Sequence, residues 1–507
     1  PLHIQAGLDE WRRGSFRFIA DHPPLAHLLP TLPLAHNSDV KLTWVFKPFV
    51  ADLVAASPSP EYIALRSRLV ILMFGVALML LVWYQARQMF SEGAANFALA
   101  LFAFSPSLIA HFSIVATDGV TTFSMFLVVV LLLRFRRQPS WRNAALLGLA
   151  LGLLLLSKLH TPPFVLLALL FMLVARRADL GVPRLWRWRQ TAFALGVAVL
   201  LLWAGYFFHV THFTTAHDSL FATFPPDPKP APLNVVMLHK IDAWVPAGEY
   251  VCGFIQTLQH NSGGHAKFAM GARTFGYMPL LFPLVIALKW PPVVLVLLGC
   301  SVVLFALRKL KPIEDWQVLV AFPVALLGLA MASQIASGER HLLPAYPIVL
   351  LFAAGTWEYA RRSVRNRVLM PVLFLAAIAN AADVSRYAPA YLSYFNPLIR
   401  PNETYKYLAG SDLDWGQGML ALKHYQDEHS DEKLFVAFVG VAQPSVYGIR
   451  ATLLPPNQPQ AGTIVIGASN LAGYASREDC GYCWVQKYPL KTVLNHSMFV
   501  YDVPALP

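Results

Sequence analysis

Charged side chains are scarce in this sequence of 507 residues: they make up 13% of it, whereas hydrophobic residues make up 56%. This balance excludes an ordinary water-soluble globular protein, in which about a quarter of the residues are charged. Long apolar runs recur along the chain, and several approach the roughly 20 residues that cross a bilayer as a helix. The composition therefore predicts a polytopic α-helical membrane protein.

Acidic residues are fewer than basic ones, 28 against 40, and the formal net charge is +12. An excess of this size is also typical of proteins that bind nucleic acid. Here the Lys and Arg residues stand in short clusters between the apolar runs, which is the pattern that orients membrane proteins. We therefore expect membrane lipid around the chain and no nucleic-acid partner.

Cysteine is rare, with four residues in the whole chain. Cys300 lies within an apolar run, so we expect a small core residue there. Cys480 and Cys483 form a CxxC pair without a second pair, which argues against a zinc site. On an oxidising side of the membrane, this spacing favours a local disulfide.

Ten apolar runs are predicted to be membrane helices, at 68–86, 97–115, 119–134, 143–157, 162–175, 190–208, 290–307, 317–335, 342–358 and 368–385. The basic clusters beside these runs all fall on one side of the membrane, which the positive-inside rule makes the cytoplasmic side. These clusters are Arg87; Arg134, Arg136, Arg137 and Arg142; Arg176, Arg177, Arg184, Arg187 and Arg189; Arg308, Lys309 and Lys311; and Arg361, Arg362, Arg365 and Arg367.

Three domains follow from this alternation. They are a first extracytoplasmic loop over 1–66, whose preceding helix we expect to be missing; a helical membrane domain over 67–385, with a large extracytoplasmic loop at 209–289; and a soluble extracytoplasmic α/β domain over 386–507. Within the large loop, 277–289 is apolar, but the chain must cross the membrane an odd number of times between 276 and 308. We therefore expect an interfacial or re-entrant helix at 277–289.

Asp118 is the only formal charge between Glu92 and Arg134, and it lies between two apolar runs. It should therefore sit at a bend between two membrane helices. A carboxylate at this depth is costly unless it has a partner or a function. Two interpretations stay open: a helix N-cap, or an acid of a functional site.

Further polar residues lie near the outward ends of the predicted helices: Asp21, His22, His27, Lys158, His160, His260, His265, Arg273, Lys289, Glu339, Arg340 and His341. Each cation alone is readily explained as a side chain that extends its charge to the interface. Together with Asp118, they are typical of a site for an anionic group at membrane depth, such as a lipid phosphate. The histidines are candidate ligands for a divalent metal, although their spacing matches no standard zinc pattern.

Several motifs resemble the C-type, membrane-embedded glycosyltransferases of family 39, the bacterial homologues of protein O-mannosyltransferases and the lipid A aminoarabinose transferase. The matching segments are Pro1-Leu2-His3 with Asp21-His22-Pro23-Pro24-Leu25; Thr117-Asp118; Ser157-Lys158; Gly264-His265; Arg340-His341 with Tyr346-Pro347; and Ser411-Asp412-Leu413-Asp414-Trp415-Gly416-Gln417. The last resembles the Ser-Asn-Leu-Asp-Trp-Gly-Gln of one bacterial subgroup. Asp412 departs from it, as does His341 from the Tyr usual in its motif.

The resemblance implies the C-type glycosyltransferase fold in the bacterial cytoplasmic membrane. It also implies a polyprenyl-phosphate-linked sugar donor and inverting displacement toward a protein, lipid or glycan acceptor at the outer face. By analogy, the main catalytic base would stand just before Pro1, Asp118 would be the second acid, and the donor phosphate would be bound by Lys158, Arg340, His22 and His27. Further substrate or loop candidates are His3, Asp21, His160, His265, Tyr346, Asp414 and Trp415. The resemblance assigns no metal ligand.

Two other functions stay open. A transporter or flippase for a lipid-linked sugar would need polar residues at the bilayer midplane and often has internal repeats. The predicted spans are nearly uncharged inside, and no repeat is evident. The other alternative is a non-catalytic membrane scaffold whose outer domain binds a partner.

Overall fold

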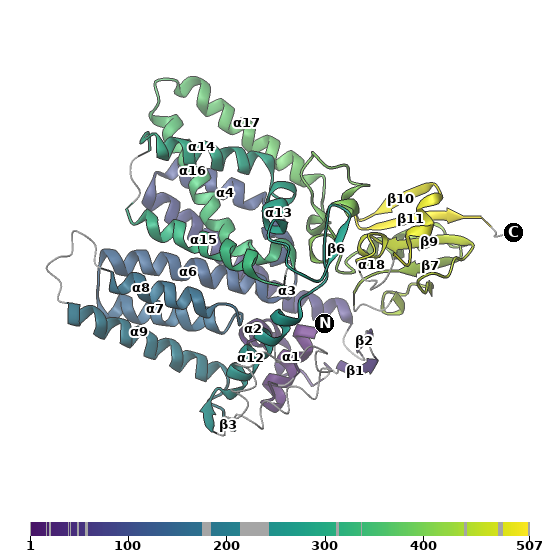
Figure 1. Cartoon of the computed structure of the whole chain (residues 1–507), viewed down its shortest axis with the longest axis horizontal. Coiled ribbons are helices and arrows are strands. Elements are labelled where there is room, and N and C mark those ends of the chain that lie inside the picture. Colours follow the sequence, from purple (N-terminus) through teal and green to yellow (C-terminus); the bar gives the residue numbers. More distant parts are fainter. Residues whose placement is uncertain are drawn as a thin grey trace.

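A computed structural model describes residues 2–16, 18–19, 22–38, 40, 42–47, 50–55, 59–174, 184–212, 243–310, 314–335, 337–440, 444–474 and 480–504. Asp21 and the basic residues Arg176, Arg177 and Lys311 lie outside this part. The chain forms a large helical bundle with a sheet-containing C-terminal region at one end, on the right in Figure 1.

Four helices are long and apolar enough to cross a membrane: α3 (Pro60–Met89), α6 (Thr117–Arg137), α9 (Arg184–Gly205) and α17 (Asn366–Ser385). Two bent pairs bring the number to at most six within the described residues: α4 (Glu92–Ala103) with α5 (Pro106–Phe112), and α13 (Leu281–Lys289) with α14 (Pro292–Ala306). Shorter apolar helices are α2 (Leu25–Ala35), α7 (Trp141–Leu155), α8 (Pro162–Leu173) and α15 (Trp316–Ala332). The expected multi-pass helical membrane fold is confirmed.

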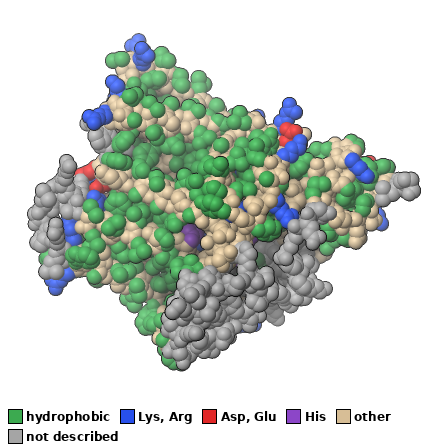
Figure 2. Space-filling model, viewed as in Figure 1, with side chains coloured by type: hydrophobic (Ala, Val, Ile, Leu, Met, Phe, Trp, Pro, Cys, Tyr) green, Lys and Arg blue, Asp and Glu red, His purple; other side chains and the backbone are tan. Residues whose placement is uncertain are grey.

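Helix α6 is the centre of the bundle. Its most apolar window is 78% buried, against 17% for α17, and it contacts α3, α7, α8 and α15. The outer helices instead expose large apolar side chains, such as Met73 on α3 and Phe374 on α17. Figure 2 shows hydrophobic side chains over much of the helical part and most visible Lys and Arg side chains toward its margins. This distribution suits a bundle surrounded by lipid.

Prolines break two of the predicted helices. The run 97–115 is two helices, with a 64° bend where Pro106 begins α5, because proline has no N–H to continue the preceding helix. The run 342–358 becomes α-helical only at α16 (Tyr346–Arg362), after a 3₁₀ turn at Leu343–Ala345. The expected separate helix at 277–289 is α13, which bends by 112° into α14 at Pro291 and Pro292.

The described parts of the loops 1–66 and 209–289 contain helices and strands. The first contains α1 (Leu2–Arg13), α2, β1 (Leu42–Lys47) and β2 (Val50–Ala55), and the large loop contains β3 (Val210–His212), β4 (Trp244–Pro246), α12 (Gly248–Gly263), β5 (Lys267–Ala269) and β6 (Ala272–Thr274). Helix α1 packs closely on α2. A Cβ at Gly7 would lie 2.2 Å from the backbone oxygen of His27, so only glycine permits this approach.

The C-terminal region is the expected α/β domain. Its five-stranded sheet has the order β10-β11-β9-β7-β8, with β7 (Leu434–Ala437), β8 (Thr452–Leu453), β9 (Gly462–Gly467), β10 (Leu490–Leu494) and β11 (Met498–Val503). Strands β8, β7 and β9 are parallel, whereas β9, β11 and β10 are antiparallel. The expected helix near 419–427 is α18 (Met419–Glu428).

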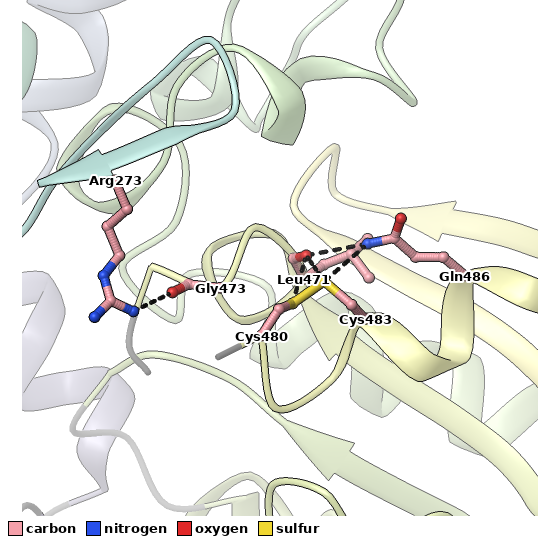
Figure 3. Close-up of a disulfide and its surroundings, with 6 residues drawn as sticks. All are labelled: Arg273, Leu471, Gly473, Cys480, Cys483 and Gln486. Carbon is pink, nitrogen blue, oxygen red and sulfur yellow. Dashed lines mark hydrogen bonds between the residues drawn. A yellow bond between two sulfur atoms is a disulfide. The ribbon is translucent and has the colours of Figure 1, made fainter. Parts of the chain in front are cut away.

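The cysteines divide into two cases. Cys480 and Cys483 are disulfide-bonded, as expected, and both sulfurs lie near the backbone oxygen of Leu471 (Figure 3). In the same region, Arg273 of β6 donates to the backbone oxygen of Gly473 at 3.1 Å, which joins the large loop to the C-terminal domain. The expectation for Cys300 is wrong: it is exposed on α14. A uniformly apolar helix does not reveal which of its faces meets lipid.

Candidate active site

Asp118 lies in the first turn of α6, immediately after the bend that follows α5. The N-cap of α6 is Ala116, with no side-chain capping bond, so the N-cap interpretation of Asp118 is wrong. Its carboxylate instead points to Lys158: the Lys158 Nζ donates to Asp118 Oδ1 at 2.6 Å. The Asp118 side chain is fully buried, so this partner offsets a large desolvation cost.

Lys158 comes from the short connection between α7 and α8. Ser157 Oγ and Thr161 Oγ1 both donate to the Leu154 backbone oxygen, at 2.7 and 3.0 Å, and they hold this connection against the end of α7. Pro162 then begins α8. These bonds place the Lys158 backbone so that its side chain reaches α6.

Arg340 is the second cation at Asp118. It comes from the 3₁₀ turn η2 (Gly338–His341), and its Nη1 lies 3.9 Å from Asp118 Oδ2. Its Cζ also lies 5.2 Å from the ring centroid of Trp415. Trp415 in turn meets the His111 ring edge-on, with centroids 5.8 Å apart. The C-terminal domain therefore contributes an aromatic wall to a site within the bundle.

The charges at this cluster do not balance. Lys158 and Arg340 bring two positive charges to one Asp118 carboxylate, in a place where Asp118 is fully enclosed and Lys158 is 12% exposed. Cations in a poorly solvated site attract anions strongly. The arrangement can therefore receive an anionic group beside Lys158 and Arg340, with Asp118 keeping the two cations in place.

Histidines surround the cluster, and their environments differ. His3 stacks on His27 at 5.1 Å and meets His22 edge-on at 5.4 Å, whereas His160 lies 6.0 Å from His341. His27 is fully buried and its Nδ1 bonds to Glu10 Oε1 at 2.8 Å. Its polar partner is thus a carboxylate of α1.

His265 lies apart from these rings, in the large loop. Its ring meets His260 at 5.1 Å, and its backbone N–H donates to Gln334. Burial lowers the pKa of His265 to about 4. Within the described residues, no group of three His, Cys, Asp or Glu side chains is arranged to hold a metal ion.

Tyr346 takes part in a buried network beside Arg340. Its hydroxyl donates to Glu339 Oε1 at 3.2 Å, and Ser107 Oγ donates to the same oxygen. Burial raises the pKa of Glu339 to about 7. The backbone N–H of Glu339 donates to Asp412 Oδ1 at 2.7 Å, so this network reaches the C-terminal domain.

Lys289, at the end of α13, connects the same two parts of the chain. Its Nζ donates to the backbone oxygens of Asp412 at 2.6 Å and Leu392 at 2.9 Å. Gly338 permits the close approach, because its φ is +72° and a Cβ there would lie 2.4 Å from the Asp412 carboxylate. The turn that carries Arg340 is therefore held directly against the C-terminal domain.

Asp414 shapes the turn that presents Trp415. Its Oδ1 accepts from the Gly416 N–H at 2.9 Å, and the Trp415 N–H donates to Gln417 Oε1 at 2.6 Å. Burial raises the pKa of Asp414 to about 7. Helix α18 begins later, with Gly418 as its N-cap.

The structure thus brings most of the candidates to one region. Asp118 pairs with both Lys158 and Arg340, and Arg340 lies over the ring of Trp415. Asp21 lies outside the described residues. Sequence reasoning missed His111, Ser107 and Glu10. His111 and Ser107 fall within an apolar run assumed to be one span; the proline at 106 was the available signal that the run breaks. Nothing in the sequence pointed to Glu10 as the partner of His27.

A family model described as Dolichyl-phosphate-mannose-protein mannosyltransferase matches residues 64–206. No curated protein matches the chain. Among solved structures, the chain is similar to ArnT from Cupriavidus metallidurans bound to undecaprenyl phosphate, with 11% identity, a TM-score of 0.46, and coverage of 98% of this chain and 92% of that chain.

Two further solved structures show weaker similarity. One is the arabinofuranosyltransferase AftD from Mycobacteria, with 14% identity, a TM-score of 0.38, and coverage of 88% of this chain and 35% of that chain. The other is the Archaeoglobus fulgidus oligosaccharyltransferase, with 15% identity, a TM-score of 0.36, and coverage of 88% and 63%. The family match covers 143 of the 507 residues, including Asp118 and Lys158, and the chain is a membrane glycosyltransferase that over this stretch is similar to the dolichyl-phosphate-mannose-protein mannosyltransferases.

Proposed function

We propose that this enzyme moves a sugar from a polyprenyl-phosphate carrier to an acceptor at the outer face of the bacterial cytoplasmic membrane. Lys158 and Arg340 would bind the donor phosphate. Asp118 would hold them in position. The observation that carries the proposal is the buried Asp118 carboxylate with two cations, at 2.6 and 3.9 Å, at the end of a membrane helix.

The position of this cluster suits a lipid phosphate. Asp118 begins α6, a helix of 21 residues, so the cluster lies at one end of a segment about 30 Å long. A bilayer's hydrocarbon core has about this thickness. A polyprenyl chain could then remain in hydrocarbon while its phosphate meets Lys158 and Arg340.

The reaction would be a displacement at the anomeric carbon. The acceptor oxygen forms a bond to that carbon, the bond from the carbon to the phosphate oxygen breaks, and the lipid phosphate leaves with the electron pair. The acceptor proton passes to a base. Cations beside the leaving phosphate stabilise the charge that it gains.

Asp118 is poorly suited to be that base. Its carboxylate already accepts a hydrogen bond from Lys158 and faces Arg340, and both cations stabilise its ionised form. A positioning role for this acid fits the geometry better. Trp415, over the Arg340 guanidinium, would limit the orientations open to that cation.

The sidedness of the chain is part of the proposal. We place 1–66, the large loop 209–289 and the domain 386–507 outside the cytoplasm, with the membrane domain at 67–385. The disulfide between Cys480 and Cys483 supports an oxidising location for the C-terminal domain. Labelling of single introduced cysteines in intact cells and in inverted vesicles tests this arrangement.

The test of function uses purified full-length enzyme in proteoliposomes with a panel of radiolabelled polyprenyl-phosphate sugars. Lys158→Ala and Asp118→Asn should lose about 100-fold in sugar release or transfer, because the first removes a cation that binds the phosphate and the second removes the carboxylate that positions Lys158 and Arg340. Arg365→Ala, which removes an exposed cation elsewhere, is the matched control. Full activity in both site variants contradicts the assignment, and movement of intact donor across the bilayer without cleavage would instead support a flippase.

A further inference from the structure

A cavity of about 520 Å³ opens at the end of the bundle that lies farthest from Asp118 along α6. It is formed where α3, α6 and α16 end and where the chain leaves α14. Its lining includes Met89 and Phe90 from α3, Arg137 from α6 and Lys309 after α14. Nothing in the proposed transfer reaction uses this cavity.

The cavity lies about one bilayer thickness from the Asp118 cluster. Helix α6 runs without a break from Thr117 to Arg137, which separates the two by about 30 Å. If one end of α6 lies at the phosphates of one leaflet, the other end lies at the head groups of the opposite leaflet. The cavity is therefore at the depth where phospholipid phosphates are found.

Cations outnumber acids at the cavity. Arg137, Lys309 and Arg362 line it, together with Glu314 and Glu358. Glu358 is buried and already holds both Arg361 and Arg362, while Arg137 lies 3.4 Å from Glu314. Among the described residues, no acidic side chain forms an ion pair with Lys309, which is exposed. An anion in the cavity would meet Lys309 and the two arginines.

The remaining lining is apolar or aromatic. Met89, Phe90, Leu310 and Tyr359 line the cavity together with the cations. Tyr84, in the α3 segment that leads to Met89, and Leu307, directly after α14, are exposed. A cationic rim against apolar walls suits a phosphate group joined to acyl chains, whereas a free anion would gain nothing from the apolar part.

We propose that this cavity binds the head group of an anionic phospholipid in the leaflet opposite the sugar-transfer site. Its phosphate would lie against Lys309 and Arg362, and its glycerol and upper acyl carbons against Phe90 and Met89. The site would fix the height of the bundle in the bilayer, because it anchors the end of α6 opposite Asp118.

Native mass spectrometry of the detergent-purified full-length enzyme tests this site. The probes are phosphatidylglycerol, phosphatidylcholine with the same acyl chains, and inorganic phosphate. We expect phosphatidylglycerol to bind in preference to phosphatidylcholine. Lys309→Gln should weaken this binding about fivefold, the effect of one cation near an anionic head group, and Arg367→Gln, outside the cavity, should leave it unchanged.

Thermal unfolding with the same lipids is the second measurement. Phosphatidylglycerol should raise the unfolding temperature of the wild-type enzyme and of Arg367→Gln more than that of Lys309→Gln. Equal binding of phosphatidylcholine, or no difference between Lys309→Gln and Arg367→Gln, overturns the proposal. Displacement of the lipid by inorganic phosphate at equal concentration would also overturn it, in favour of a free-phosphate site.

Discussion

The Lys158 ammonium donates to the Asp118 carboxylate at 2.6 Å and so joins the α7–α8 connection to the first turn of α6. Forty residues separate the two in the chain. The pair lies at the N-terminal end of α6, which is the most buried of the four long apolar helices. Its charge balance therefore matters to the stability of the bundle as well as to any ligand.

We expect Asp118→Asn to lower the free energy of unfolding by about 3 kcal/mol, because it leaves the largely buried Lys158 and the partly exposed Arg340 without their counter-charge. Asp118→Asn with Lys158→Met should recover part of this loss, because the double variant removes a buried cation as well. Unfolding in a mixed-micelle denaturation series measures both. Lys158→Met alone completes the comparison. If the double variant loses as much free energy of unfolding as Asp118→Asn and Lys158→Met lose together, the pair is not coupled.

Trp415→Ala should reduce the transfer rate about tenfold, because the Arg340 guanidinium loses the ring 5.2 Å from its Cζ. Trp415→Phe keeps an aromatic face and should retain most of the rate. Steady-state transfer assays at varied donor concentration measure the effect.

Trp484→Ala is the control, since Trp484 lies in the same domain and packs near Tyr488 instead of Arg340. If Trp484→Ala and Trp415→Ala reduce the rate equally, the loss reflects the stability of the domain and not the contact with Arg340.

Asp414 and Glu339 should each lower the stability as the pH rises from about 4 to about 7, whereas the lowered pKa of His265 acts in the opposite direction within this window. Burial raises the pKa of Asp414 from 3.8 and that of Glu339 from 4.5, each to about 7 in the folded enzyme. In this window the unfolded chain releases these protons while the folded chain retains them, so ionisation favours unfolding. Thermal unfolding at a series of pH values measures the slope.

Asp414→Asn should reduce this slope, because asparagine does not ionise and its side-chain oxygen can still accept from the Gly416 N–H. Asp431→Asn, an exposed acid in the same domain, serves as the control. A slope that Asp414→Asn leaves unchanged would assign the pH dependence to other groups.

Removal of the disulfide should destabilise the C-terminal domain only slightly. The bond joins residues three positions apart, and closing so short a loop limits the unfolded chain by about 2 kcal/mol. Cys480→Ser with Cys483→Ser should therefore lower the unfolding temperature by a few degrees and keep transfer activity. Loss of activity without loss of stability would contradict this expectation and show that the bond positions residues of the active site.

The multi-pass helical fold was predictable because apolar runs indicate it directly. Two helix boundaries were missed for the same physical reason: a proline changes the helix without changing the hydropathy. Pro106 begins the separate helix α5 that carries Ser107 and His111, and Pro344 lies in the 3₁₀ turn that precedes α16.

The candidate site was predictable in part. The sequence shows three charged residues at the ends of apolar runs: Asp118, Lys158 and Arg340. Burying a charge there costs desolvation free energy, which made them candidates, and the structure brings them together. His27 belongs to the same list, yet its partner is Glu10 on α1, which no pattern indicated. Pairings between loops depend on how the loops pack, and spacing along the chain does not encode that packing.

Trp415 belongs to a domain that begins more than thirty positions after η2, yet it covers a guanidinium inside the bundle. A truncated enzyme that ends after α17 would keep every apolar helix described here, but it would lack the aromatic ring that lies over Arg340. Exchanging the C-terminal domain between related enzymes would consequently change the residue that faces Arg340. On the proposed function, we expect this exchange to alter the choice of substrate while the lipid-facing helices stay the same.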